Sequence, residues 1–448
     1  MAQRTSAQPR KPNTSPHHQS ILVRNCKLWT EAGLREGSLL LEDGKIRKIG
    51  RQIRQPASSR IDGRGLVALP GLIDAHTHLR ALGLRHKEDF TTGTASAAAG
   101  GFTSVLDMPN TVPPTDTPAR LAAKMEDASN KILVNVGFHA AAVGARLSIK
   151  KMARMGAFSF KLYLPRPISP LDVNDNTLRR LIRASSEEDV PLTVHAEEPT
   201  ELKTVRPQTF YDMAQSRPAR AEIHAIERIR QLREPLGSPI HFCHVSIASN
   251  LQRIHSSPGL TAEVTPHHLL LSNKSLKHLT WKAWMVPPLR SETVRRRLLQ
   301  ATVSGRADVI ASDHAPHEIK EKAVQPRDSP PGIPGLETTL PLLMSLVGKG
   351  VMSLRTIVAC LARNPARIFG LNSKGRIEHG TDADIILVDP NKRSVVRPEK
   401  FLSKAKYSPF EGWTTQGQVD TTIVGGHVIF ERGQIVAAPG SGVVLKRN

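Results

Sequence analysis

Cysteine is scarce in this chain. Only Cys26, Cys243 and Cys360 occur among its 448 residues. So few thiols argue against a disulfide framework and favour a reducing compartment, which we expect to be the cytoplasm. Long apolar runs are also missing, because no stretch approaches the roughly 20 residues of a membrane-spanning helix. The composition is otherwise that of a globular enzyme, with 39% hydrophobic and 23% charged residues.

Aromatic residues and acidic charge are the other two shortages. Aromatics make up 4% of the chain, and 40 acidic residues face 62 lysines and arginines, which gives a net charge of +22. Such an excess raises nucleic acid as a partner. The basic clusters at 146–154, 295–297 and 397–406 are not interleaved with aromatics that would stack on bases. We therefore interpret them as solvated surface that weakly steers anionic substrates, and expect no nucleic-acid or membrane partner.

The first 20 residues are polar and rich in proline and serine. They lack the apolar segment of a secretory signal, and this composition predicts a disordered tail at residues 1–20. Because they contain basic and no acidic residues, a transit peptide is the alternative. His17 and His18 are assigned to the tail and not to a metal site.

Both ends of the remaining chain are strand-like. Asp43-Gly44 between alternating apolar residues is a hairpin signal, and further turns are predicted at Gly425-Gly426 and Arg432-Gly433. The two flanks predict one small composite domain, a β-sandwich, built from residues 21–67 and 372–448.

The long middle part, residues 68–371, alternates strands with helices. Eight strands with intervening helices fit an α/β fold of the (β/α)8 TIM-like barrel type, which would form the larger domain. Helices are predicted at 118–128, 175–189 and 221–232, and the gap at 265–306 is expected to hold long active-site loops. Strands after the first are predicted at 101–108, 131–138, 158–164, 191–197, 239–245, 260–266 and 307–314.

A short apolar strand ends in two histidines, in LPGLIDAHTHLR at residues 69–80. Residues i and i+2 of a strand face the same side, so His76 and His78 can present both imidazoles to one point. Neutral imidazole nitrogen is a good ligand for zinc. Two histidines that only meet water are the alternative, and the rest of the chain decides between the two.

Other polar residues belong to later predicted strands. His195, His244 and Asp313 stand near strand ends, and the fourth strand carries Lys161. Catalytic groups of such a barrel lie at the C-terminal ends of its strands, so these residues and the two histidines should converge on one mouth. A lysine ammonium is a poor neighbour for metal cations. A carbamylated amine is instead a carboxylate able to bridge two metals, and burial beside cations favours the neutral amine that this modification requires.

Several longer motifs carry a family resemblance. They are DAHTHLR (74–80), MPNT (108–111), FKLYL (160–164), TVHAEE (193–198), HFCHVS (241–246), EVTPHHLLLS (263–272), ASDHAPH (311–317) and PGLET (334–338). On these motifs the chain resembles the dihydroorotases of the amidohydrolase superfamily. It is similar to their longer, class I-type members and to the dihydroorotase domain of the animal multifunctional pyrimidine protein, over about residues 20–448.

The resemblance implies a binuclear zinc site. His76, His78 and Asp313 would hold one ion, His195 and His244 the other, and carbamylated Lys161 would bridge them. It also implies that Arg80, Asn110 and His317 grip the carboxylate and ring amide of the substrate. A planar guanidinium suits a carboxylate, and an asparagine offers both donors and an acceptor. His267 and His268 are expected to belong to loop structure.

The implied reaction is the reversible hydrolysis of (S)-dihydroorotate to N-carbamoyl-L-aspartate in pyrimidine biosynthesis. A zinc-bound hydroxide attacks the ring amide carbonyl, and Asp313 acts as general base and then as general acid. The resemblance further implies a homodimer and an association with aspartate transcarbamoylase. One alternative is another cyclic amidohydrolase, that is, a hydantoinase, dihydropyrimidinase or allantoinase. Another is a non-catalytic scaffold, although every metal position is filled here.

The chain departs from the family pattern in two places. Ala81-Leu82-Gly83 stands where the family has Glu-Pro-Gly after the arginine, and the stretch after Lys161 reads PRPISP (165–170). The second departure concerns the closing contacts of that loop more than the chemistry.

Overall fold

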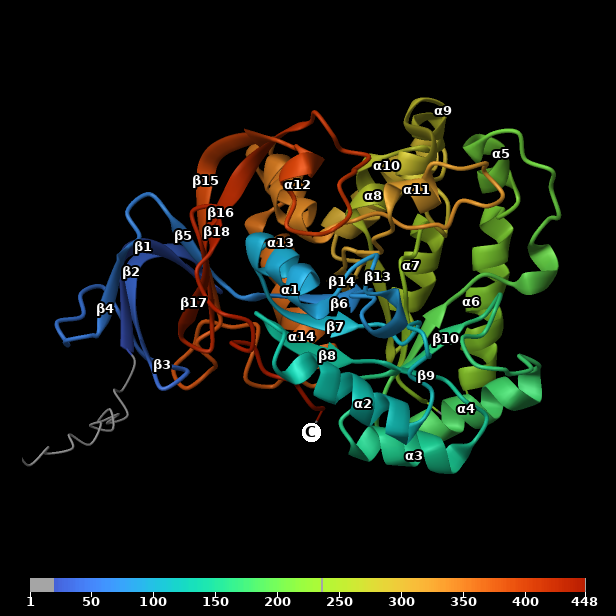
Figure 1. Cartoon of the computed structure of the whole chain (residues 1–448), viewed down its shortest axis with the longest axis horizontal. Coiled ribbons are helices and arrows are strands. Elements are labelled where there is room, and N and C mark those ends of the chain that lie inside the picture. The colour runs from blue at the N-terminus through green and yellow to red at the C-terminus, as the bar shows by residue number, and fades with distance from the viewer. Residues whose placement is uncertain (1–19, 235–236, 448) are drawn as a thin grey trace, which may run out of the picture.

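The computed structural model describes residues 20–234 and 237–447, and Figure 1 shows their arrangement. The tail predicted at 1–20, with His17 and His18, lies outside this part except for its last residue. Ser20 is already the first residue of strand β1, so the β-rich part begins one residue earlier than predicted.

One nine-stranded sheet is built from both flanks of the chain. Its hydrogen-bonded order is β18-β17-β16-β15-β5-β1-β2-β3, and β4 pairs with β1. Strand β5 joins the two halves, because it runs parallel to β1 and antiparallel to β15. The strands are β1 (Ser20–Thr30), β2 (Gly33–Glu42), β3 (Lys45–Gly50), β4 (Ser59–Asp62), β5 (Val67–Pro70), β15 (Ile385–Val395), β16 (Thr414–Val424), β17 (His427–Glu431) and β18 (Gln434–Ile435).

The turns predicted for these flanks are present. Asp43 and Gly44 both have positive φ, 51° and 71°, and connect β2 to β3. Positive φ at both central residues is what a two-residue hairpin of this hand requires. Gly425-Gly426 and Arg432-Gly433 likewise connect β16, β17 and β18 with positive φ.

The middle of the chain forms two parallel sheets that are hydrogen-bonded to each other at both edges. One has the order β6-β7-β8 and the other β14-β13-β12-β11-β10-β9. Phe158 N donates to Phe138 O at one edge, and a parallel bridge joins Thr77 to His314 at the other. The strands are β6 (Leu72–Thr77), β7 (Phe102–Asp107), β8 (Asn135–Phe138), β9 (Ala140–Ala141), β10 (Phe160–Tyr163), β11 (Leu192–His195), β12 (Ile240–Phe242), β13 (Leu260–Val264) and β14 (Val309–Ile310).

Helices alternate with these strands, and their starts follow the sequence. Thr117 accepts a hydrogen bond from Arg120 N and precedes Pro118 at the start of α2, and Asn174 caps α4 in the same way. The helices are α1 (Phe90–Ala99), α2 (Pro118–Ser129), α3 (Arg146–Arg154), α4 (Asp175–Glu187), α5 (Phe210–Gln215), α6 (Ala219–Arg233), α7 (Ala248–His255), α8 (Pro266–Leu270), α9 (Leu276–Leu279), α10 (Glu292–Val303), α11 (Ile319–Lys322), α12 (Leu336–Gly348), α13 (Leu354–Val358) and α14 (Asn364–Ile368).

The prediction of long loops at 265–306 is wrong. That stretch contains α8, α9 and α10, and α10 runs over Glu292–Val303 with Ser291 as its cap. Among residues 20–234 and 237–447, no helix combines the length and the apolar character needed to cross a membrane.

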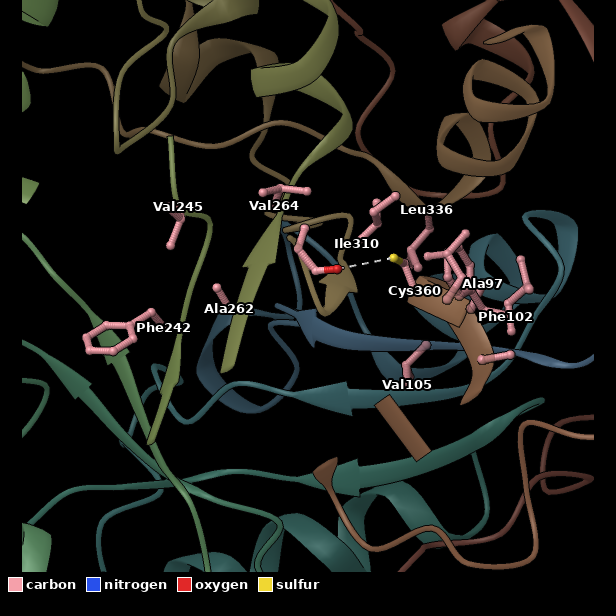
Figure 2. Close-up of a cluster of buried hydrophobic side chains, with 14 of the residues drawn as sticks. Ala97, Phe102, Val105, Phe242, Val245, Ala262, Val264, Ile310, Leu336 and Cys360 are labelled. Carbon is pink, nitrogen blue, oxygen red and sulfur yellow. Dashed lines mark hydrogen bonds between the residues drawn. The ribbon is translucent and has the colours of Figure 1, made fainter. Parts of the chain in front are cut away.

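The largest hydrophobic core lies between the parallel strands and the helices around them. Figure 2 shows part of it, with Ile310 of β14 near Leu336 of α12 and with Val264 of β13 and Phe242 of β12 further along the same cluster. The thiol of Cys360 donates to Ala307 O at 3.6 Å in the same cluster. The three cysteines are free and buried. This packing fixes the strands, and therefore the side chains at their ends.

Candidate active site

The first pair of histidines is fixed by a buried carboxylate. His76 lies in β6 and His78 directly after it, and Asp74 of the same strand accepts hydrogen bonds from His76 N and Ser312 N. Burial raises the pKa of Asp74 to about 7. Ser312 precedes Asp313, so this contact holds the ends of β6 and β14 together. Sequence alone indicated the histidines but not this connection.

The predicted site residues form two adjoining groups. The carboxylate Oδ1 of Asp313 lies 3.4 Å from His76 Nε2 and 3.3 Å from His78 Nε2. In the second group His195 Nδ1 lies 3.0 Å from His244 Nε2. The rings of His76 and His244 have centroids 5.3 Å apart, so the two groups are neighbours. Pairs of ligand atoms at such distances suit shared metal ions, whose bonds to nitrogen are about 2 Å long.

The other ring nitrogen of three histidines is held by an oxygen. His76 Nδ1 donates to Glu263, His195 Nε2 donates to Glu197 at 2.7 Å, and His78 Nδ1 donates to Asn110 Oδ1 at 2.6 Å. Each contact leaves the second nitrogen of the same ring directed at the centre of the site. Histidines that bind metals are oriented by such partners, which also make them better ligands.

The protonation states match a metal site. Burial lowers the pKa of His78 and of His195 to about 4, and the pKa of His244 lies well below its usual value for the same reason. These rings are therefore neutral near pH 7 and carry a free lone pair. Burial opposes the charge of Asp313, but the neighbouring His76 and His78 hold the pKa of its carboxyl below the usual range. Neutral imidazoles around an ionised carboxylate are the donor set that zinc prefers.

Lys161 of β10 is buried, with 4% of its surface exposed. Its Nζ donates to Cys243 Sγ at 2.8 Å, and within the described part of the chain no carboxylate oxygen lies within 4.0 Å of it. A buried ammonium without an opposite charge is costly. Conversion of this amine to a carbamate would remove the positive charge and add two oxygen ligands.

A cavity of about 500 Å³ opens above these residues. All nine residues that the sequence singled out contribute to its wall: His76, His78, Arg80, Asn110, Lys161, His195, His244, Asp313 and His317. Ligand atoms of His76, His78 and Asp313, and of His76, Cys243 and His244, lie within 4.8 Å of one another in each set. Strand-end reasoning supplied six of the nine residues, and the family resemblance supplied Arg80, Asn110 and His317.

The residues predicted to grip the substrate lie along one side of this cavity. Arg80 Nε donates to Pro316 O at 3.1 Å, and its terminal nitrogen Nη2 lies 3.0 Å from His317 Nε2. Both nitrogens of His317 already have protein partners, since Lys87 Nζ lies 3.1 Å from Nδ1 and Nε2 lies 3.1 Å from Pro331 O. Asn110 uses Oδ1 for His78, which leaves its amide NH2 for a ligand.

The first departure from the family pattern has a structural counterpart. Arg80, Ala81 and Leu82 all have positive φ, at 59°, 48° and 44°. Non-glycine residues rarely adopt this region, and each costs of order 1 kcal/mol. The chain reverses here, and the reversal aims the Arg80 guanidinium into the cavity wall.

His267 and His268 do not lie in a loop, as was expected, but in the short helix α8. His268 is fully engaged, with Nδ1 2.8 Å from Thr265 Oγ1 and Nε2 2.9 Å from Pro287 O. His267 Nε2 is buried and has no hydrogen-bond partner among the described residues. Neither histidine contributes to the wall of the cavity.

Three residues of the site were missed from the sequence: Glu197, Cys243 and Glu263. Glu263 at the end of β13 is fully buried and joins His76 to His241, whose Nε2 lies 3.2 Å from Glu263 Oε2. A carboxylate inside an apolar strand was the available signal. Glu197 stands two residues after His195, the same spacing that identified the first pair of histidines.

The buried histidines predict acid sensitivity of the metal-free protein. Within the described part of the chain, burial lowers the pKa of seven histidines and raises that of three carboxyls. The histidines are His78, His139, His195, His244, His267, His268 and His317. The carboxyls are Asp74, Glu222 and Glu337.

Between about pH 4 and 6.5 the unfolded chain binds more protons at these histidines than the folded chain does. The carboxyls act in the opposite sense but are fewer, so stability should rise with pH in this window. We expect the free energy of unfolding of metal-free protein to increase by at least about 1.4 kcal/mol per pH unit, the effect of one net proton. Urea denaturation at several pH values measures it, and a flat or falling profile would contradict the assignment.

Comparison with known proteins agrees with this geometry. The sequence profile of the Amidohydrolase family matches residues 67–429. A dihydroorotase of Methanothermobacter thermautotrophicus is 40% identical over 94% of this chain and 96% of its own length. A dihydroorotase of Pyrococcus furiosus is 36% identical over 92% of this chain and 93% of its own.

Solved structures give a similar result. An L-hydantoinase (dihydropyrimidinase) from Arthrobacter aurescens superposes with a TM-score of 0.92 at 28% identity, over 96% of this chain and all of that one. A dihydropyrimidinase from Brevibacillus agri superposes with a TM-score of 0.89, also at 28% identity, over 96% of this chain and 99% of that one. With its strand-end histidines, its buried acid and these matches over most of its length, the chain belongs to the amidohydrolase family.

Proposed function

We propose that the protein is a dihydroorotase, which interconverts (S)-dihydroorotate and N-carbamoyl-L-aspartate in pyrimidine biosynthesis. The observation that carries this proposal is the 40% identity to a dihydroorotase over 94% of the chain. The cavity agrees with it, because Arg80 and Arg166 line its wall and Asp313 is the one carboxylate there among the described residues. Such a wall suits an anionic ring. The likeness to class I-type enzymes and to the animal multifunctional protein remains part of this proposal.

The nearest competing function is that of a hydantoinase or dihydropyrimidinase. It is favoured by the solved structures, whose folds superpose at 28% identity. The sequence relatives named as dihydroorotases are more similar, and hydantoin has no carboxylate for the two arginines. We therefore rank hydantoinase or dihydropyrimidinase activity below dihydroorotase activity.

Two zinc ions belong to the proposed site. His76, His78 and Asp313 would hold one ion, His195 and His244 the other, and carbamylated Lys161 would lie between them. When bound, such ions lower the pKa of water and polarise a carbonyl. Asp313 then takes the proton of the attacking water and returns it to the leaving ring nitrogen. Its lowered pKa keeps the carboxyl ionised near neutral pH, which is the form that a proton acceptor needs.

Arg80, Asn110 and His317 are proposed to bind the substrate. The guanidinium of Arg80 pairs with the ring carboxylate, and the free amide NH2 of Asn110 donates to an oxygen of the ligand. His317 supports Arg80 from beside it, at 3.0 Å. The positions of these residues around one cavity support the assignment.

The architecture around the site is also part of the proposal. We interpret the two parallel sheets as a (β/α)8 barrel over residues 68–371, because they are joined at both edges. The strands of 21–67 and 372–448 would form a β-sandwich around a separate core that includes Val23, Leu39 and Ile385. A cytoplasmic homodimer that associates with aspartate transcarbamoylase completes the proposal, and size-exclusion chromatography with and without that enzyme tests it.

The decisive experiment combines an assay with metal analysis. Protein purified without chelator should contain about two zinc ions per chain and turn over dihydroorotate in both directions. With hydantoin, dihydrouracil and allantoin measured in parallel, kcat/KM for dihydroorotate should exceed the others by at least about a hundredfold. Chelation should abolish activity, and zinc with bicarbonate should restore it. A metal-free, inactive protein would instead support the scaffold alternative.

A further inference from the structure

The loop after β10 brings a second arginine into the wall of the catalytic cavity. Arg166 lines it together with Pro167 and Ile168. Its side chain is exposed, and no hydrogen bond or ion pair to its guanidinium is found within residues 20–234 and 237–447. A guanidinium without a protein partner at the mouth of a cavity is available to a ligand anion.

The loop is tied to another segment that lines the cavity. Ser169 is buried, and its Oγ donates to Asp116 Oδ2 at 2.6 Å. Asp116 belongs to the segment that also carries Asn110 and Thr111, which line the same cavity. Arg166 itself stands between Pro165 and Pro167, and both prolines restrict the backbone around it. These restraints keep the guanidinium near the cavity at a low entropic cost.

Arg166 differs from Arg80 in its surroundings. Arg80 is buried, with 7% of its surface exposed, and is held by Pro316 O and His317. These contacts hold its guanidinium in the wall of the cavity. Arg166 lies at the solvent edge, where it meets an anion on entry and can pair with it after binding. The sequence PRPISP at this place is one of the two departures from the family pattern.

We propose that Arg166 is a substrate-binding residue that selects rings with a carboxylate over uncharged cyclic amides. The inference rests on the proposed function and adds to Arg80 a second guanidinium that distinguishes an anionic ring from hydantoin-like rings at this site. A charge-assisted, bidentate contact to the carboxylate supplies the selectivity. An uncharged ring gains nothing from the same guanidinium.

The test compares two substrates that share a six-membered ring. Dihydroorotate carries a carboxylate and dihydrouracil does not. For Arg166→Gln we expect KM for dihydroorotate to rise about tenfold, with kcat within about twofold of the original, which is the effect of one lost charge-assisted contact. For dihydrouracil, KM (if it is a substrate) or the inhibition constant (if it is a competitive inhibitor) should not change. The salt dependence of kcat/KM for dihydroorotate should weaken as well.

Two further variants complete the design. Arg166→Lys keeps the charge but loses the bidentate geometry, so its KM should lie between those of the original and the glutamine variant. Arg179→Gln removes a matched exposed arginine on α4, away from the cavity, and should leave both constants unchanged. Thermal melting checks that each variant is folded.

The outcomes separate the two proposals. If Arg166→Gln behaves like Arg179→Gln towards dihydroorotate, the inference is wrong and the dihydroorotase assignment stands. If KM for dihydroorotate and the KM or inhibition constant for dihydrouracil rise together, the loop contacts both rings without distinguishing their charge. The inference is then also wrong. If the original protein does not turn over dihydroorotate, both proposals fail.

Discussion

Replacing Asp313 by asparagine should lower kcat for dihydroorotate by about a thousandfold or more, while zinc stays bound. The amide keeps an oxygen near His76 and His78 but cannot accept the proton of the attacking water. Asparagine is the better variant for this position, because Asp313 has a φ of +47° and asparagine tolerates that region better than alanine. Zinc content and kcat are measured on the same preparation.

A matched control is Asp328→Asn, which removes an exposed carboxylate outside the cavity and should leave kcat unchanged. An Asp313→Asn protein that retains zinc and more than about a tenth of the original kcat would remove Asp313 from the proton transfer. Loss of zinc in the same variant would mean that its main role is to bind metal.

Replacing Lys161 by methionine should remove most of the bound zinc and lower kcat/KM by at least about a thousandfold. Methionine fills the buried space but offers no carbamate oxygen. Lys161→Arg is the informative partner variant, because it keeps a long cation that cannot be carbamylated. Both variants should fail to the same degree if the carbamate is what the site needs.

The modification itself can be followed with isotopically labelled bicarbonate. The original protein should incorporate the label at one lysine when it is reconstituted with zinc, and both Lys161 variants should not. An active Lys161→Arg enzyme, or an active original enzyme without the label, would show that the amine acts unmodified.

Much of the fold follows from patterns that are local in the sequence. Apolar runs placed the parallel strands to within a few residues, and the helices predicted at 118–128 and 175–189 begin where α2 and α4 do. The strand predicted at 131–138 starts only at Asn135, because Lys131 N instead donates to Ala128 O and ends the preceding helix. Local hydrogen bonding of this kind competes with strand propensity, and a single sequence does not show which of the two determines the backbone conformation.

Site residues that stand at the ends of strands could be predicted from the sequence. Residues that only orient or contact other site residues could not. His76, His78, His195, His244 and Asp313 follow from that rule, and Lys161 follows from its place in a strand. The contacts of Glu263 and Cys243 join different strands, so their meaning depends on packing that the sequence does not display. Asp74 is a similar case, since its partner Ser312 follows β14 and lies 238 residues later in the chain.

The position of β5 has a consequence for how the protein is made. This strand pairs with β15, which is synthesised only after the parallel strands and the helices between them, and it leads directly into β6, which carries the first histidine of the proposed metal site. During synthesis the edge of β5 that pairs with β15 therefore stays unpaired until β15 has been made. Nascent chains stopped before β15 should consequently be easily cleaved by protease near residues 67–70 and should bind zinc poorly, even when every residue of the catalytic cavity has been translated.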